Sequence, residues 1–94
     1  MPTRITQIDE RHSNRTTLKV EGSLLLEDAE LIAEICSDLQ TSFNKSITLD
    51  LSELDFLDSD GASVLCGLKR ERNVALEGVH LFIQKVIELS EQEN

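Results

Sequence analysis

Apolar and polar residues alternate along several short stretches of the 94-residue chain, a pattern that predicts strands with one buried face. The clearest stretch covers residues 16–21 and ends at Gly22, and another covers 46–51. The segment 3–10 alternates less regularly and is followed by a polar turn at 11–14. We therefore expect an edge strand there, joined to the next strand in an antiparallel hairpin.

Between these strands, apolar residues recur at spacings of three and four, which indicates helices. A first helix is expected to begin between Leu24 and Asp28 and to end before the polar turn around residues 40–46. Its acidic first turn suits the positive end of the helix dipole. A second, short helix follows Gly61, with basic residues near its end.

The last stretch has two interpretations. One continues the second helix to Leu76 and places a strand at 79–83. We favour a brief fourth strand at 73–77 and a final helix from about His80 to Gln92, because the apolar spacing beyond Gly78 is helical. The residues with that spacing are Val79, Phe82, Ile83, Val86 and Ile87.

This order of elements predicts the α/β class. Strands that alternate with helices pair in parallel through right-handed crossovers, and the alternating strands indicate that one sheet face carries most of the helices. We expect a single domain over residues 1–94. It has two layers, with about three helices mainly on one face of a mixed four-stranded sheet that starts with an antiparallel hairpin.

Charge narrows the classes of partner. Eighteen acidic residues stand against nine basic ones, for a formal net charge of -9. Such a surface repels nucleic acid and anionic lipid, so we expect neither as a partner. A basic patch on a partner protein is the natural complement.

Cys36 and Cys66 lie at apolar positions of the expected helices and lack the spacing of a zinc or redox motif. We expect buried free thiols. No apolar run is long enough for a membrane span, and the N-terminus lacks a signal-peptide core, so a cytoplasmic protein is expected.

Candidate catalytic groups do not combine into a known arrangement. His12 and His80 are far apart in the chain and are expected to be solvated, and neither pairs with Ser59. Asp55, Asp58 and Asp60 could approach Mg²⁺ or Ca²⁺, but their spacing is not that of an EF-hand. We expect no enzymatic activity, no metal and no cofactor.

The segment Leu49–Gly61, LDLSELDFLDSDG, combines a hydrophobic strand, an Asp-Leu-Ser turn, a hydrophobic pair and an Asp-Ser-x-Gly helix start. It resembles the signature of STAS domains, the family of bacterial anti-sigma factor antagonists. The leading hairpin, the first helix and the crossover beyond Gly61 are similar in pattern. In phosphorylatable members of the family the serine directly after the aspartate accepts the phosphate, which on this sequence is Ser59.

The resemblance implies a partner-switching role in transcription regulation. The partner would be an anti-sigma factor or related serine kinase of the histidine-kinase-like ATPase type. The alternative is a non-phosphorylated interaction subunit of an ABC transporter or sensory complex, and a homodimer is a further option. The residues expected to contact the partner surround Ser59: Asp55, Phe56, Leu57, Asp58, Asp60, Gly61 and Ser63.

Two alternatives stay open at this motif. Asp58 or Ser59 could serve simply as a helix N-cap, which is compatible with phosphorylation. Phe56 and Leu57 could contact the partner, although core packing at the strand end is favoured. Asp60 stands where the family usually has a small, uncharged residue. It would either weaken kinase docking or partly imitate the phosphorylated state.

Overall fold

Five strands and three helices follow one another in the computed structural model, which describes residues 3–10 and 12–93. The strands are β1 (Arg4–Asp9), β2 (Arg15–Leu24), β3 (Ser46–Asp50), β4 (Leu54–Leu57) and β5 (Ala75–Glu77). The helices are α1 (Leu26–Phe43), α2 (Ser59–Glu71) and α3 (Leu81–Glu93). The predicted α/β class is confirmed.

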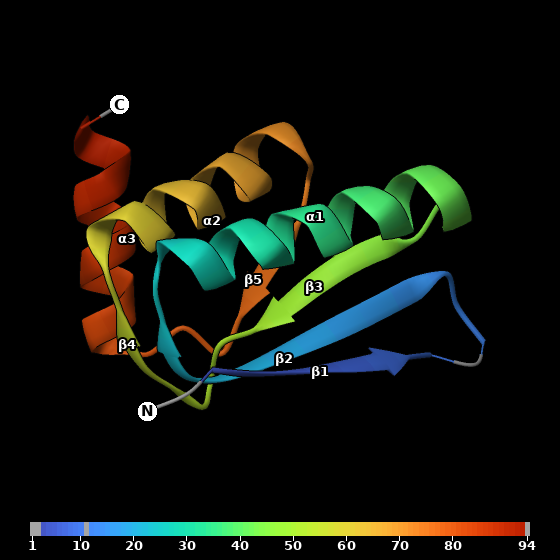
Figure 1. The fold of residues 1–94 in the computed structure, drawn as a ribbon, viewed down its shortest axis with the longest axis horizontal. Helices are drawn as coiled ribbons and strands as arrows, with labels where there is room; N and C mark the ends of the chain where they lie inside the picture. The colour runs from blue at the N-terminus through green and yellow to red at the C-terminus, as the bar shows by residue number, and fades with distance from the viewer. Residues whose placement is uncertain (1–2, 11, 94) are drawn as a thin grey trace.

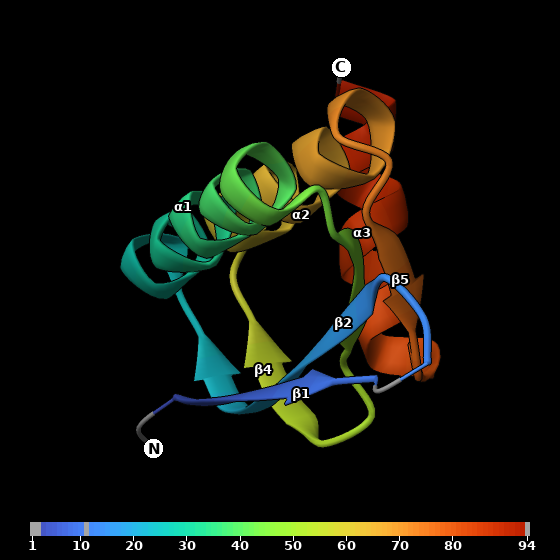
Figure 2. The same ribbon diagram turned by 90° about the vertical axis from the view of Figure 1, so that its right-hand side faces the viewer.

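The sheet follows the order β1-β2-β3-β5, with β4 paired to β2 outside this path. β1 and β2 form the predicted antiparallel hairpin, and the other pairs are parallel. Figures 1 and 2 show α1 and α2 side by side on one face of the sheet, with α3 standing upright against α2. The two-layer arrangement with helices mainly on one face is therefore confirmed.

The core lies between this face and the helices. Alternate residues of β2 and β3, such as Leu18, Val20 and Leu49, are fully buried there. Both cysteines are free and buried, as predicted. Burial raises the pKa of the Cys36 thiol to about 11 and also raises the pKa of Cys66. Both thiols are therefore protonated at neutral pH.

The sheet has five strands, so the predicted number of four is wrong. The additional strand is β4, which was not among the predicted strands. β2 runs past Gly22, where the register shifts, and its last residues, Ser23 and Leu24, pair with Phe56 and Leu57. Along β4 the outer two residues are buried and the middle two are exposed, so the expected alternation is absent.

The C-terminal part follows the favoured interpretation. β5 lies within the predicted 73–77 segment and α3 covers the predicted final helix, so a strand at 79–83 is wrong. Ile83 and Ile87 are buried on α3, whereas the burial of Phe82 lies outside what the structure describes. Between these elements Gly78 has a φ of 69°. A side chain there would collide with Ser52 and Asp50.

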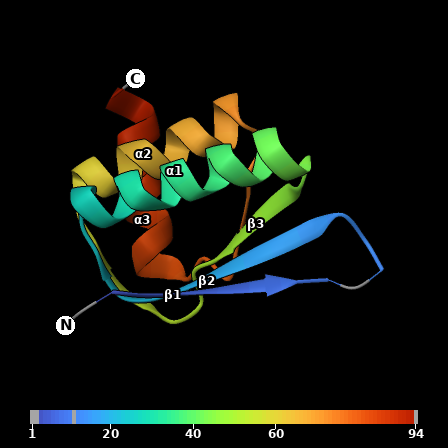
Figure 3. The same ribbon diagram turned by 45° about the vertical axis from the view of Figure 1, so that its right-hand side comes forward.

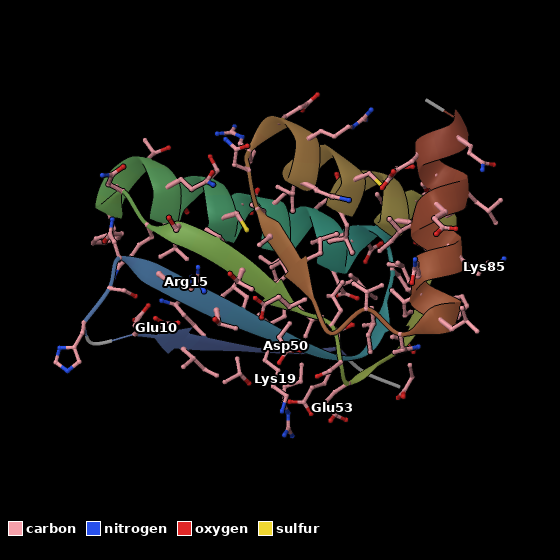
Figure 4. The ribbon with its side chains drawn as sticks, turned by 180° about the vertical axis from the view of Figure 1, so that it is seen from behind. Glu10, Arg15, Lys19, Asp50, Glu53 and Lys85 are labelled. Carbon is pink, nitrogen blue, oxygen red and sulfur yellow. The ribbon has the colours of Figure 1, made fainter. Side chains whose placement is uncertain are left out.

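The other face of the sheet is open and polar. Figure 4 shows Arg15 and Lys19 of β2 and Asp50 of β3 on this face, which carries no helix of the described residues. The Ser52 backbone N–H donates to Asp50 Oδ1 at 3.0 Å and lowers the pKa of that carboxyl. Among the helices that the structure describes, none has the length and hydrophobicity to cross a membrane.

Candidate functional site: the junction between β4 and α2

The junction is fixed by pairing between two neighbouring strand ends. The N–H of Asp58, the residue after β4, donates to the carbonyl of Leu24 at the end of β2, at 3.3 Å. Asp58 itself has an extended backbone, with φ −81° and ψ 167°, and the helix begins at the next residue, Ser59. The sheet therefore determines where α2 starts and in which direction it leaves.

Asp58 is the N-cap of α2. Its Oδ1 accepts a hydrogen bond from the Gly61 N–H at 2.6 Å, which satisfies one of the free donors at the helix start. Gly61 is needed for this geometry. A Cβ at that position would lie 2.8 Å from Asp58 Oδ1 and 3.2 Å from the Leu24 carbonyl oxygen. Of the two candidate caps, Asp58 performs the role.

Ser59 is the first residue of α2 and is exposed. Within the described residues, no hydrogen bond engages its hydroxyl group. Its carbonyl accepts two hydrogen bonds from side chains, Ser63 Oγ at 3.1 Å and Ser90 Oγ of α3 at 3.3 Å. The backbone of Ser59 is thus held in place while its hydroxyl is open to another molecule.

The side chains expected to contact a partner divide into two groups. Asp55, Phe56, Asp60 and Ser63 are exposed and Asp58 is half-buried, whereas Leu57 and Gly61 are buried. The preference for core packing is right for Leu57, at 2% exposure, and wrong for Phe56, at 44%. The reason is that β4 pairs only with the end of β2, so the core covers one residue of the pair.

Two exposed apolar residues beside the junction were not anticipated. Leu25 follows the carbonyl that holds Asp58, and Leu26 begins α1; they are 46% and 38% exposed. Leu25 lies at helical spacing from Ala29 and Ile32, which favours a buried position. It is instead the N-cap residue of α1, where the spacing does not apply. With Phe56 these residues give the acidic junction an apolar component.

His80 is exposed, as expected, and its ring also contacts the junction. Its Nε2 lies 2.8 Å from the carbonyl oxygen of Leu54, the first residue of β4. His12 is exposed in the hairpin turn. In the part of the chain that the structure describes, no group of three His, Cys, Asp or Glu residues is placed to hold a metal ion. Asp58 uses one carboxylate oxygen for the helix cap.

The chain is thus a small α/β domain in which the first residue of α2, Ser59, is exposed at the end of a strand. A family model described as "Mlab, STAS domain" matches residues 9–93. The chain belongs to the STAS domain family, as the motif around Ser59 predicted. It is an interaction module of that family.

Solved structures show the same fold. The anti-sigma factor antagonist SpoIIAA, in its unphosphorylated form, superposes with a TM-score of 0.69 at 20% identity, over 92% of this chain and 83% of that one. The STAS domain of an antisigma-factor antagonist from Rhodobacter sphaeroides gives a TM-score of 0.56 at 19% identity, over 81% and 86%. Mglu gives 0.58 at 26% identity over 72% of this chain, which spans only 18% of Mglu. No curated protein matches the chain.

Proposed function

We propose that this chain is an anti-sigma factor antagonist-like module whose protein partner covers the start of α2 and is released when Ser59 is phosphorylated. The observation that carries the proposal is the division of roles between two adjacent residues. Asp58 caps the helix at 2.6 Å, so the exposed Ser59 hydroxyl is not needed for structure. Because Ser59 is not the cap, its hydroxyl can be modified while the hydrogen bond between Asp58 and Gly61 stays in place.

The local electrostatics suit a switch. A phosphoryl group adds close to two negative charges, which the N-terminus of a helix tolerates. The carboxylates of Asp55 and Asp60, which are close to Ser59 in the chain, are exposed. A partner that covers the start of α2 would have to desolvate the phosphate. The helix would therefore keep its fold while the complex is weakened.

The proposed partner is an anti-sigma factor or a related serine kinase of the histidine-kinase-like ATPase type. Such a kinase would transfer the γ-phosphoryl group of ATP to Ser59 Oγ. The new P–O bond forms as the bond to the β-phosphate oxygen breaks, the hydroxyl proton passes to a base of the kinase, and ADP leaves. The surface suits a partner with an apolar centre and a basic rim, since Phe56, Leu25 and Leu26 are exposed among carboxylates.

A non-phosphorylated interaction subunit, of an ABC transporter or a sensory complex, is the second candidate. The observation in its favour is Asp60, an exposed carboxylate in the first turn of α2 next to Ser59. A permanent charge at this position partly imitates the modified state. In this case Ser59 would not be phosphorylated, and the partner would bind the unmodified junction only.

Affinity capture from native cells tests the proposal. The baits are the wild-type chain, Ser59→Ala and Ser59→Glu, with Ser42→Glu as a control that adds the same charge on an exposed position of α1. Wild type, Ser59→Ala and Ser42→Glu should retain one common protein partner that Ser59→Glu loses. Retention of that partner by Ser59→Glu would overturn the proposed surface. Intact-mass measurement of the recovered wild-type bait separates the two candidates, because only the switch leaves a phosphorylated fraction.

A further inference from the structure

α3 is tied to the β4–α2 junction near both of its ends. His80, directly before α3, contacts the Leu54 carbonyl at 2.8 Å. Ser90, near the other end, donates to the Ser59 carbonyl at 3.3 Å. The helix therefore spans the segment from the start of β4 to the start of α2, as the views in Figures 1 and 3 show.

Ser90 lies in the buried face of α3. It is 2% exposed and follows Ile83 and Ile87 at helical spacing. Its Oγ also lies 3.4 Å from Ser63 Oγ, and Ser63 itself donates to the Ser59 carbonyl. Two hydroxyl groups from different helices thus meet at one carbonyl in the first turn of α2. A hydroxyl at a buried helix–helix contact is retained with low cost only where it has such a partner.

The ends of the two helices that meet here have opposite partial charges. The first turn of α2 carries the positive end of its dipole, and the last turn of α3 carries the negative end of its own. The last turn of α3 contains no basic residue of its own, and Lys69 of α2 lies 3.6 Å from the carboxylate of Glu91 in that turn. In the unmodified protein these ends attract each other. A phosphoryl group on Ser59 would add negative charge where the end of α3 contacts the start of α2.

We propose that α3 reports the state of Ser59: Ser90 positions the end of α3 on the Ser59 carbonyl, and negative charge on the Ser59 side chain weakens that docking. Ser90 is a positioning residue in this device, since it acts through the backbone of Ser59. The inference rests on the proposed phosphorylation of Ser59 for its biological use. The coupling between charge at Ser59 and the stability of α3 can be tested without phosphorylation.

Amide hydrogen exchange, followed by NMR on the whole chain, tests the coupling. Ser59→Glu should speed exchange in the last two turns of α3 by about threefold or more, while Ser59→Gln, of the same shape without charge, should not. Ser90→Ala alone should speed exchange of the same amides. In the double variant, Ser59→Glu should add little, because the tie is already absent. Amides of β2 and β3 serve as the internal check that every variant is folded.

Two results would overturn the inference. One is unchanged α3 exchange in Ser59→Glu, and the other is an equal effect of Ser59→Glu in the presence and absence of the Ser90 hydroxyl. The second result would show that Ser90 is only structural. These failures are distinct from failure of the proposed function: the exchange experiment needs no kinase, and loss of a captured partner by Ser59→Glu would stand without any change in α3.

Discussion

α1 and α2 start next to each other but are built differently. The N-cap of α2 is Asp58, whose carboxylate accepts a backbone hydrogen bond, while the N-cap of α1 is Leu25, which makes no such bond. Both caps have extended backbones and are joined through the Leu24 carbonyl. α2 therefore starts with a fixed geometry around an open serine. α1 starts with an exposed leucine at a position where a polar residue would stabilise the helix by about 1 kcal/mol.

This difference indicates what each helix start contributes. At α2 the backbone around Ser59 is fixed by the Asp58 cap, by the close packing at Gly61 and by the hydrogen bond from Ser90 of α3. At α1 the stabilising side-chain cap is absent, and an exposed leucine occupies the cap position. We interpret the first as the part of the surface that is modified and the second as a part that a partner covers.

The largest effect is expected at Gly61. Gly61→Ala should lower the free energy of unfolding by about 1–2 kcal/mol, because the new methyl group collides with the cap and with the Leu24 carbonyl. Gly67 of α2 is the matched control, since a Cβ there meets no atom within 4 Å. Gly67→Ala should raise the free energy of unfolding by about 0.5–1 kcal/mol. Urea unfolding followed by circular dichroism measures both.

Equal effects of the two glycine substitutions would contradict the role assigned to Gly61. They would mean that the start of α2 adapts without cost, and that the cap geometry is not specified by the strand ends.

A smaller, opposite pair of effects is expected at the two caps. Asp58→Ala should cost about 1 kcal/mol in the free energy of unfolding, and Leu25→Asp should add about 0.5–1 kcal/mol, because the new carboxylate can accept a hydrogen bond from the first turn of α1. The same urea titrations provide the measurement. If Leu25→Asp destabilised the protein, Leu25 would be a packing residue, and the contrast between the helix starts would be lost.

The regular parts of the fold could be predicted from sequence because their burial follows the periodicity. β2 alternates along a sheet covered on one face, and Ile83 and Ile87 are buried at helical spacing. In β3, Ile47 and Leu49 are buried at alternate positions, but Thr48 between them is buried as well. β4 could not be recognised in this way. It pairs with β2 beyond a register shift, so its burial depends on a bulge in a distant strand and not on its own sequence.

The residues of the candidate site that are close in sequence could be predicted, but its contacts with distant residues could not. Asp58, Ser59 and Gly61 are close in sequence, and helix-start chemistry is local. The ties from His80 and Ser90 join residues 26 and 31 positions apart. A serine or histidine near an apolar helix face gives no sign of which distant carbonyl it meets. The exposure of Leu25 was missed because a cap residue lies outside the helical periodicity.

The most direct test of the central claim is phosphorylation of the purified chain by the cognate kinase with Mg-ATP. Intact mass and fragment spectra report the site and the modified fraction, and a known antagonist run in parallel shows that the kinase is active. We expect one phosphoryl group, located on Ser59, that is absent from Ser59→Ala and retained in Ser42→Ala. An unmodified chain beside a fully modified antagonist, or modification at another serine, would contradict it.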